Sequence, residues 1–577
     1  MSTVKVGVPL ILVGLLAACG DETGPAFPTQ VAFSFQPANA IAGEAFAPAL
    51  RVVLQDRSGQ RVRGSTLTVG VRLAANAAGG VLAGTLTRDA VDGVATFDNL
   101  RLDKAGAGYT LKALAIDYPQ IVEDTTAAFD VLSGPPVLSF IRQPDTAEGQ
   151  EPLDPAVQVR AAADQFGNPL SNAPVTLALV AGPAGASLQG TTTVTAVDGV
   201  ATFDSITIAR LGQGFVLEAR SGTATTVRSA AFSVRASFAH VAVGGNHTCA
   251  ITSGGFAYCW GHILLEDTST SSSYETPQPV AGGHRFSRLG VGSAQACGVT
   301  AGNIAYCWGA FGTPASPAVV PGGLSFVQVS TGSEHHCGVT TANAAYCWGR
   351  NSEGQLGDST TDQRLAPTAV YGSLSFASVS VGSYYTCGLT TTGAAYCWGD
   401  NFAGVLGDST TQARHAPTPV VGGHTFASLS AGYAHVCAVT TAQVAYCWGW
   451  NGGGQIGDNS TSARAAPTPV LGGLSFAQVS AGTDHTCGIT TGDIAYCWGF
   501  NDYGRLGDGT SVQREAPVPV SGGLTFAAIA AGPLHSCGVT PGHVAYCWGH
   551  DGDGRLGTVP PEIPSPRRAS CTESNRH

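Results

Sequence analysis

Residues 476–523 read FAQVSAGTDHTCGITTGDIAYCWGFNDYGRLGDGTSVQREAPVPVSGG. Variants of this unit follow one another from Phe238 almost to the C-terminus. Their most constant string, AYCWG, begins at Ala257, Ala305, Ala345, Ala395, Ala445, Ala495 and Ala545. Short alternating stretches between Gly, Pro and Asn turns predict β-strands. One small sheet cannot bury both of its faces, but sheets that repeat around a ring bury each face against a neighbour. The repeat therefore predicts a β-propeller.

The unit resembles the repeat of the regulator of chromosome condensation family. It has that family's G-x-x-H before the inner strand, its Y-x-W-G and its N-x-x-G-x-L-G turn, and NSEGQLGD from Asn351 is nearly the family consensus. The resemblance implies a seven-bladed propeller over residues 237–560, in which the recurrent Trp fills the layer between blades. Members of the family range from nucleotide exchange on a small GTPase to β-lactamase inhibition and light sensing, so the fold does not name a partner. How the ring closes stays open.

Each unit contains two cysteines ten residues apart. Cys487 and Cys497 flank a predicted hairpin whose tip lies near Thr491, and its equal arms place the two cysteines opposite each other. A disulfide needs Cβ atoms within about 4.5 Å, and such bonds form in oxidising compartments. We predict seven disulfides, Cys249–Cys259, Cys297–Cys307, Cys337–Cys347, Cys387–Cys397, Cys437–Cys447, Cys487–Cys497 and Cys537–Cys547.

A metal site is the alternative, because a histidine stands two residues before the first cysteine in five units. These are His247, His335, His435, His485 and His535. Zinc sites, however, favour closely spaced cysteine pairs, and the units with Gln295 and Tyr385 instead of histidine keep both cysteines. We therefore predict neither metal nor cofactor, and we expect the histidines to hydrogen-bond to backbone groups between blades.

The N-terminus predicts export. Lys5 precedes a short apolar stretch, Val6–Ala18, which is too short to span a bilayer and ends in LAAC at Cys19. This ending resembles a bacterial lipobox, which implies a signal peptide over residues 1–18, a lipidated Cys19 and a linker over 19–30. By the sorting rules of bacterial lipoproteins, Gly20 directly after the cysteine implies transport to the outer membrane or cell surface. The choice between inner and outer membrane stays open. An ordinary secretory signal with a chance cysteine is the alternative.

Two units of about a hundred residues separate this segment from the propeller. VDGVATFDNL from Val91 returns as VDGVATFDSI from Val197. Alternating stretches with frequent turns predict β-sandwiches over 31–133 and 134–236. The stretches LQDRSGQRVRG and AADQFGNPLSN resemble a turn of invasin-type bacterial immunoglobulin-like domains. Such units serve as a stalk or as adhesive domains, and we favour the stalk.

Composition limits the partners. The net charge is −11 and only 12% of residues are charged, which argues against binding a phosphate backbone. We expect no nucleic acid, and membrane contact only through the lipid anchor. Residues 561–577 are predicted to be a disordered tail, and the state of Cys571, which has no repeat partner, stays open.

Function should lie where the repeats vary, because constant positions do the structural work of every blade. Variable loop positions carry aromatic residues that are typical of binding hot spots. These candidates are Trp450, Phe500, Phe402, Tyr503, Tyr384 and Tyr433. Which face of the propeller binds stays open, and half-buried loop filling is the alternative reading of these residues. An Asp followed six residues later by an Arg recurs in the repeat, as in Asp358 and Arg364. We expect each of these pairs to brace the long loop of its blade as a surface ion pair.

We predict an all-β, lipid-anchored cell-envelope protein whose propeller recognises an unknown protein or glycan and which is not an enzyme. No catalytic residues stand out. One alternative is a polysaccharide hydrolase or lyase, for which Asp400, Glu353 and Asp502 are the nearby carboxylates. The other is an envelope scaffold without a discrete ligand.

Overall fold

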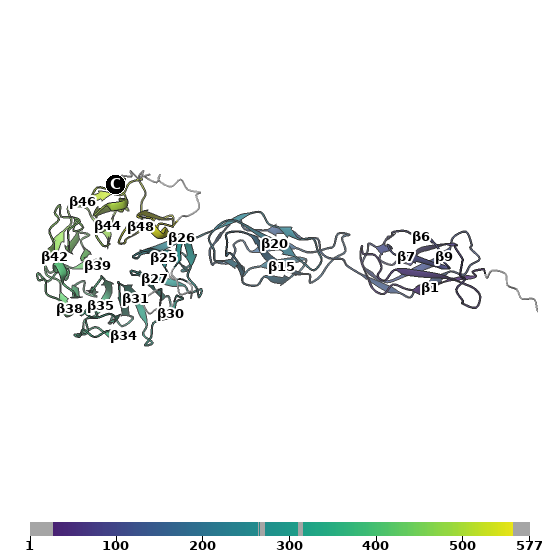
Figure 1. Ribbon diagram of the computed structural model, residues 1–577, viewed down its shortest axis with the longest axis horizontal. Helices are drawn as coiled ribbons and strands as arrows, with labels where there is room; N and C mark the ends of the chain where they lie inside the picture. The colour runs from purple at the N-terminus through teal and green to yellow at the C-terminus, as the bar shows by residue number, and fades with distance from the viewer. Residues whose placement is uncertain (1–26, 264, 266–271, 310–314, 558–577) are drawn as a thin grey trace, which may run out of the picture.

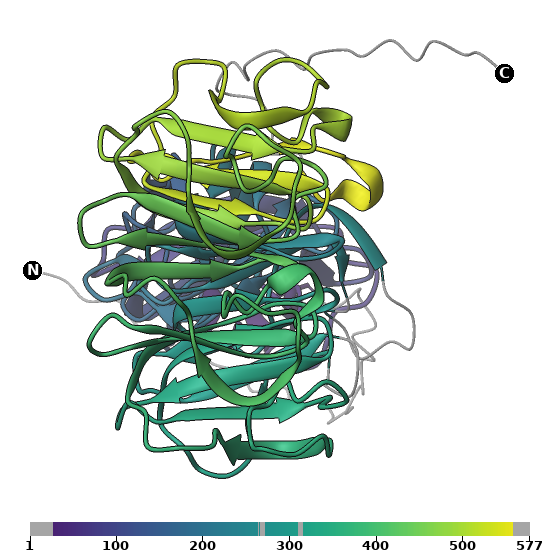
Figure 2. The same ribbon diagram turned by 90° about the vertical axis from the view of Figure 1, so that its left-hand side faces the viewer.

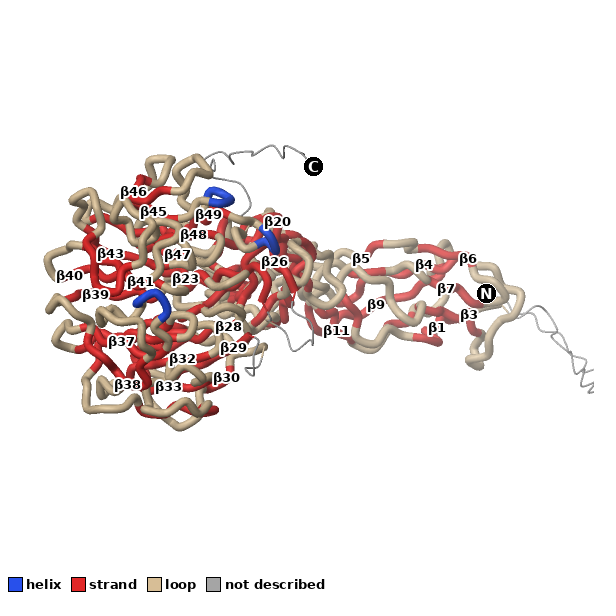
Figure 3. The backbone as a smooth tube through the Cα atoms, turned by 60° about the vertical axis from the view of Figure 1, so that its left-hand side comes forward, coloured by secondary structure: helices blue, strands red, loops and turns tan. Residues whose placement is uncertain are grey.

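The computed structural model describes residues 27–263, 265, 272–309 and 315–557, which form three bodies in a row (Figure 1). Strands make up nearly all of the regular structure, and three short 3-10 turns are the helical elements of the described part (Figure 3). Within those residues, no helix is long and apolar enough to cross a membrane. The predicted signal peptide, Cys19, Cys571 and the predicted tail lie outside the described residues.

The first body is a sandwich of two sheets. Three strands form one sheet in the order β1 (Gln30–Phe35), β3 (Leu50–Gln55), β7 (Val94–Phe97). The other sheet has the order β2 (Ala40–Ile41), β11 (Phe129–Leu132), β9 (Gly106–Ala115), β4 (Thr68–Ala75), β6 (Thr87–Asp89), with β10 (Asp124–Thr125) paired to β9. A pair of two-residue strands, β5 (Leu82–Ala83) and β8 (Arg101–Leu102), completes the body. Alternate residues of these strands, such as Leu50, Val52 and Leu54, point into one apolar core.

The second body repeats this strand order. Its smaller sheet is β12 (Ser139–Arg142), β14 (Val157–Arg160), β18 (Val200–Phe203). Its larger sheet is β13 (Thr146–Glu148), β22 (Phe232–Arg235), β20 (Gly212–Arg220), β15 (Pro174–Ala181), β17 (Thr193–Thr195), with β21 (Val227–Arg228) paired to β20. The short pair β16 (Leu188–Gln189) and β19 (Thr207–Ile208) corresponds to β5 and β8. In both bodies the short second strand pairs in parallel with the last one. The sequence duplication is thus a duplication of topology.

The third body is a propeller of antiparallel sheets that follow one another around a central axis (Figures 1 and 2). Its first sheets are β23 (Phe238–Val243), β24 (His247–Thr252), β25 (Ala257–Ile263), β26 (Ser272–Pro279), then β27 (Phe286–Val291), β28 (Gln295–Thr300), β29 (Ala305–Gly309), β30 (Ala318–Val319), then β31 (Phe326–Thr331), β32 (His335–Thr340), β33 (Ala345–Gly349), β34 (Arg364–Ala369). The next two are β35 (Phe376–Val381), β36 (Tyr385–Thr390), β37 (Ala395–Gly399), β38 (Arg414–Pro419), and β39 (Phe426–Ala431), β40 (His435–Thr440), β41 (Ala445–Gly449), β42 (Arg464–Pro469). The last two are β43 (Phe476–Ala481), β44 (His485–Thr490), β45 (Ala495–Gly499), β46 (Arg514–Pro519), and the three strands β47 (Ala528–Ala531), β48 (His535–Val539), β49 (Ala545–Gly549). The 3-10 turns η1 (Phe402–Gly404), η2 (Asp502–Gly504) and η3 (Gly552–Gly554) follow β37, β45 and β49.

Glycine lets neighbouring sheets approach closely near the ring's centre. The first strands of successive sheets contact one another. In the turn after β39, a Cβ on Gly432 would overlap the carbonyl oxygen of Gly482, and the amide of Tyr433 donates to that oxygen at 3.0 Å. Only glycine provides this approach, which explains why Gly recurs directly after the first strand of each unit.

The last sheet packs directly on the first and closes the ring. Phe238, Val241 and Trp260 of the first sheet share an apolar cluster with Cys537 and Val539 of the last. The amide of Phe238 donates to the carbonyl of His543 at 2.8 Å. The open question of closure is thereby answered for the described residues: the two ends of the repeat array meet through side-chain packing and backbone hydrogen bonds.

The second sandwich is fixed to the first sheet of the propeller. Arg285 binds both carboxylate oxygens of Glu151 at 2.8 Å. The hydroxyl of Tyr258 donates to the carbonyl of Ala209 at 2.8 Å. Tyr258 is fully buried, whereas its counterparts in the other sheets are partly exposed. This junction is therefore a packed interface and not only a tether.

Candidate functional site

All seven cysteine pairs of the repeat form disulfides in the structure. Each joins the second and third strands of one sheet, as Cys487 and Cys497 do where β44 faces β45. The Cα atoms of each pair are 4.0 to 4.1 Å apart. His336 lies beside Cys297 and Cys307, a grouping with metal-ligand character. Because the two sulfurs are bonded to each other, they are not available as thiolate ligands, and Nδ1 of His336 lies 3.5 Å from Sγ of Cys297 and 3.4 Å from the hydroxyl of Thr331.

The recurrent histidines bond to side chains of the next sheet, so the expectation of backbone partners was wrong. In four sheets, Nε2 of the histidine lies 2.7 to 2.9 Å from a Thr or Ser hydroxyl. The pairs are His335–Thr386, His435–Thr486, His485–Ser536 and His535–Thr248. The last pair spans the closure of the ring.

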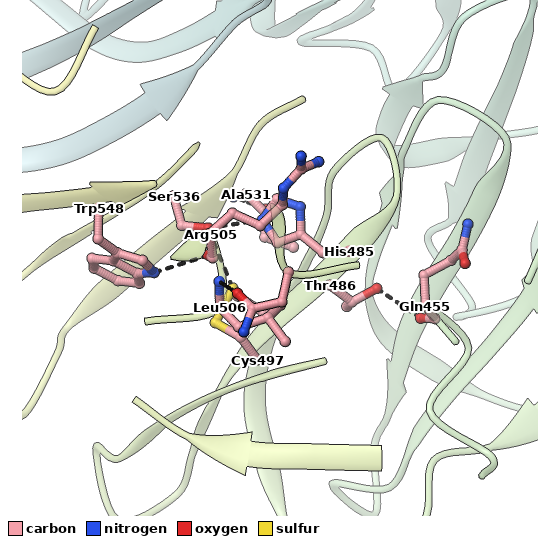
Figure 4. The surroundings of a disulfide bond; sticks show 12 residues. Gln455, His485, Thr486, Cys497, Arg505, Leu506, Ala531, Ser536 and Trp548 are labelled. Carbon is pink, nitrogen blue, oxygen red and sulfur yellow. Dashed lines mark hydrogen bonds between the residues drawn. A yellow bond between two sulfur atoms is a disulfide. The ribbon is translucent and has the colours of Figure 1, made fainter. Parts of the chain in front are cut away.

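A backbone carbonyl next to each hydroxyl fixes the direction of these histidine–hydroxyl hydrogen bonds. Each hydroxyl donates its proton to a carbonyl in the preceding N-x-x-G turn, as Thr486 does to Gln455 at 2.9 Å and Ser536 to Arg505 at 2.9 Å (Figure 4). A hydroxyl has one proton, so it accepts from Nε2–H, and the histidine is the Nε2-protonated tautomer. The same carbonyl of Arg505 accepts from Nε1 of Trp548 at 3.0 Å. Turn, Trp and His–hydroxyl pair thus form one connection between adjacent sheets.

Burial keeps these histidines neutral. It lowers the pKa of His335, His435 and His535 to about 3, and that of His485 well below its usual value. A buried base loses the hydration of its charged form, which depresses its pKa. Nearby positive charge, such as Arg555 beside His535, lowers the pKa further. The histidines are therefore structural donors and not proton carriers at neutral pH.

One exception to the histidine pattern is complementary to the residue that it faces in the next sheet. Tyr385 replaces the histidine where the next sheet offers Val436 in place of a hydroxyl. The hydroxyl of Tyr385 reaches past that valine to the carbonyls of Gly432 and His435, at 3.0 and 2.8 Å. The substitution at one position is thus matched by the substitution in its neighbour.

The recurrent Asp–Arg pairs hold the long loop of each blade. Asp358 accepts from Nε of Arg364 at 2.8 Å and from the side chain of Asn351 at 3.1 Å. Asn351 in turn accepts from the amide of Leu356 at 2.9 Å. The prediction of a loop brace is correct, but the description as a surface pair is wrong for the carboxylate, because the Asp358 side chain is only 5% exposed. These hydrogen bonds lower the pKa of Asp358 against the opposing effect of burial.

Three of the predicted aromatic residues meet at one pocket of about 270 Å³. Its lining residues are Ser383, Tyr384, Tyr385, Asp400, Phe402, Val405, Tyr433 and Ala434. They come from the turn before β36, from the segment after β37 and from the turn before β40. Because Tyr385 pairs with Gly399 in register, these segments emerge at the same end of neighbouring sheets. The pocket therefore lies on one face of the propeller, between two sheets.

Trp450 extends this surface. Its ring centroid is 5.7 Å from that of Phe402. Phe402 and Tyr433 are more than half exposed, at 59% and 53%, and Trp450 is 39% exposed. Tyr385 and Val405 are buried at the base. We call Tyr384, Phe402, Tyr433 and Trp450 the aromatic rim, in which three side chains are exposed and Tyr384 is half-buried, and such aromatic surfaces are found at binding sites.

The charges at the pocket are mainly acidic. Burial raises the pKa of Asp400, and the neighbouring Glu353 raises it further. Arg350 lies 5.1 Å over the Tyr384 ring but bonds to Glu334 at 2.6 Å. Sequence reasoning noted Asp400 and Glu353 only as candidates for the enzyme alternative and missed the pocket. The signal was present, since Asp400 occupies the variable position directly after CWG.

Phe500 and Tyr503 are not part of this pocket. Phe500 lies against Arg505, whose guanidinium carbon is 5.6 Å from its ring centre, and Tyr503 contacts His550 at 4.4 Å between ring centroids. Asp502 precedes Tyr503 in the turn η2 and is also outside the pocket. The six aromatic candidates therefore divide into the four-residue rim and a separate pair farther along the ring.

Comparison with known proteins finds similarity in the propeller. Residues 312–576 match the family model of the RCC1-like domain. Similar solved structures include Prp20p of Saccharomyces cerevisiae, with 21% identity over 51% of this chain and 80% of that one and a TM-score of 0.46. Others are human WBSCR16, with 17% identity over 56% and 92% and a TM-score of 0.48, and the ectodomain of the Arabidopsis thaliana receptor kinase ACR4, with 22% identity over 55% and 96% and a TM-score of 0.37. The curated protein sequences contain no match. Over residues 312–576 the propeller is thus similar to the RCC1-like domain.

Proposed function

We propose that this chain is an exported, lipid-anchored cell-envelope protein that binds a protein or glycan partner through the aromatic rim of a seven-bladed propeller. The two sandwiches, which we assign to the immunoglobulin-like class, serve as a stalk between the lipid on Cys19 and the propeller. The observation that carries the proposal is the rim itself: four aromatic side chains around a pocket on one propeller face. Export is supported by the disulfides, which persist outside reducing compartments.

The location of the rim favours a macromolecular partner. The rim belongs to β35–β38 and β39–β42 and the segments that follow their third strands, on the part of the ring away from the second sandwich (Figure 1). The sandwich therefore does not block the approach of a partner. Exposed Trp and Tyr residues contribute most of the binding energy in many interfaces.

Binding without catalysis is also our proposal, and the roles of the recurrent polar groups support it. The recurrent carboxylates, such as that of Asp358, accept hydrogen bonds from Arg and Asn side chains and from backbone amides. The paired histidines are held in the Nε2–H form by hydroxyl groups. Groups engaged in this way are not available as nucleophile or general base.

The test is binding by the mature exported chain under non-reducing conditions, on glycan arrays and against purified envelope proteins. The variant Phe402→Ser with Trp450→Ser should lose at least tenfold in affinity for whatever partner is found. Tyr371→Ser is the matched control, because Tyr371 is 64% exposed and follows the far end of β34, on the opposite face. Equal loss from the control, or none from the rim variant, would refute the rim as the binding surface.

A further inference from the structure

The pocket inside the aromatic rim combines π-faces with a carboxylate that has no cationic partner. Oδ1 of Asp400 accepts the amide of Phe402 at 3.2 Å. Among the described residues, no basic side chain lowers the pKa of Asp400 by its charge, and Glu353 raises that pKa instead. A partly buried carboxylate without a counter-ion is costly, and a cation bound beside it would reduce that cost.

The other carboxylates of the propeller's long loops show the contrast. Asp358, Asp408, Asp458 and Asp508 each bind the arginine six residues later, at 2.6 to 2.9 Å. Asp400 is in a different position, directly after CWG, where its counterparts Trp450 and Phe500 are uncharged. Its charge is therefore not part of the repeat's own framework.

Aromatic faces attract cations through their quadrupoles, and the attraction is strongest when the cation is desolvated. Here Tyr384, Phe402 and Tyr433 line the same pocket as Asp400. The Tyr384 ring already has one cation near it, since Arg350 lies 5.1 Å from its centroid. That arginine is held by Glu334 and does not neutralise Asp400.

The size of the pocket suits one side chain of a larger partner better than a whole small ligand. Its volume of about 270 Å³ falls just below the roughly 300 to 1,000 Å³ of sites that enclose a whole small ligand. A lysine side chain has a narrow apolar stem and a charged end, so it can lie along the rings with its ammonium at Asp400. The exposed rim around the pocket provides further area for the protein that carries the lysine.

We propose that this pocket receives the ammonium group of a lysine side chain, methylated or not, from a partner protein, with Asp400 as counter-charge and Tyr384, Phe402 and Tyr433 as the surrounding π-faces. This inference rests on the proposed function, because it assigns the ligand class of the same rim.

The experiment measures binding of small probes to the mature, disulfide-bonded chain by calorimetry and by the fluorescence of Trp450 and its neighbours. The probes are N-acetyl-lysine methylamide, its Nε-trimethyl form and the neutral isostere in which carbon replaces the trimethylated nitrogen. We expect both cations to bind at least tenfold more tightly than the isostere, and added salt to weaken them.

Asp400→Asn keeps the shape of the side chain and should reduce cation affinity about tenfold, without changing the weak affinity for the isostere. Asp502→Asn is the control, since Asp502 is an exposed carboxylate outside the pocket. Phe402→Leu, which keeps an apolar side chain, should also weaken the cations. Thermal unfolding of each variant verifies that the fold is intact.

Equal affinity for the charged and neutral probes would overturn the inference, and so would an Asp400→Asn variant with unchanged cation affinity. If an oligosaccharide binds instead and Phe402→Ser with Trp450→Ser abolishes that binding while Asp400→Asn does not, the lysine assignment fails and the rim's binding function stands. If neither the probes nor any partner depends on the rim, both proposals fail.

Discussion

Replacing Thr486 by valine tests whether the sheets are joined by buried histidine–hydroxyl bonds. The change preserves the side chain's shape but leaves Nε2–H of His435 without its acceptor, which lies 2.9 Å away. His435 is fully buried, so water cannot replace the hydroxyl. The carbonyl of Gln455 loses the Thr486 donor but keeps Nε1 of Trp498 at 2.9 Å.

One orphaned buried donor costs about 1 to 3 kcal/mol, whereas the added apolar burial of a methyl group returns roughly 0.8 kcal/mol. We therefore expect Thr486→Val to lower the free energy of unfolding by about 0.2 to 2 kcal/mol. Urea unfolding followed by Trp fluorescence measures this directly. All 8 tryptophans belong to the propeller, so the sandwiches do not contribute to the signal.

The chain itself supplies the compensating change. His435→Tyr with Thr486→Val reproduces the natural pair Tyr385 and Val436, whose tyrosine hydroxyl bonds to backbone carbonyls of the next sheet. The double variant should be more stable than the sum of the two single changes implies, with a coupling of about 0.5 to 3 kcal/mol. A neutral Thr486→Val variant, or strict additivity in the cycle, would refute the account of how neighbouring sheets are joined.

Four further outcomes follow from the described contacts and the sequence. The pKa of His335, His435 and His535 is about 3 in the folded chain, below the ordinary 6.5. Between these two pH values the unfolded chain binds more protons than the folded chain, so the free energy of unfolding should fall as the pH drops from 6.5 towards 4. A propeller that is equally stable in urea at pH 7 and pH 4.5 would contradict this. Removing one disulfide by Cys487→Ala with Cys497→Ala should cost up to about 3 kcal/mol, and an unchanged urea midpoint would contradict the chain-entropy argument. Arg285→Ala breaks the bidentate contact with Glu151. It should widen the distribution of distances between the second sandwich and the propeller, measured by pulsed EPR, and change the free energy of unfolding by under about 1 kcal/mol. An unchanged distribution would show that the Tyr258 contact alone fixes the junction. Mass spectrometry of the exported chain should find Cys19 as a lipidated first residue, and an intact segment 1–18 would refute the lipobox reading.

The propeller was predictable because its information is local and repeated. Each hairpin places one cysteine opposite another by strand register alone. In four units the N-x-x-G turn recurs and a carbonyl of the turn accepts from the Trp of the next unit. The duplicated sandwich topology was predictable for the same reason, from VDGVATFD occurring twice. The partners of the histidines were not, because they belong to the next repeat: the pair His335–Thr386 becomes visible only when residue 335 of one unit is compared with residue 386 of the following unit.

The pocket was only half predictable. Its aromatic residues were found as departures from the repeat, but they were assigned together with Phe500 and Tyr503, which the ring places elsewhere. Sequence distance does not show which variable positions of neighbouring blades converge. Asp400 and Tyr433 are far apart in the chain, and they line one pocket because two successive sheets present their loops at the same end.

A repeated framework makes an unmatched polar group informative. The four recurrent Asp residues and four of the five recurrent His residues have partners within the ring, such as Arg364 for Asp358 and Thr386 for His335. Asp400 occurs in one copy and lacks a cationic partner among the described residues. It lies in a pocket that is also lined by Tyr384, Phe402 and Tyr433. Structure alone does not require a carboxylate there, since Trp450 and Phe500 occupy the same position in the next two copies, and a charge retained without a structural role is the one most readily explained by a ligand.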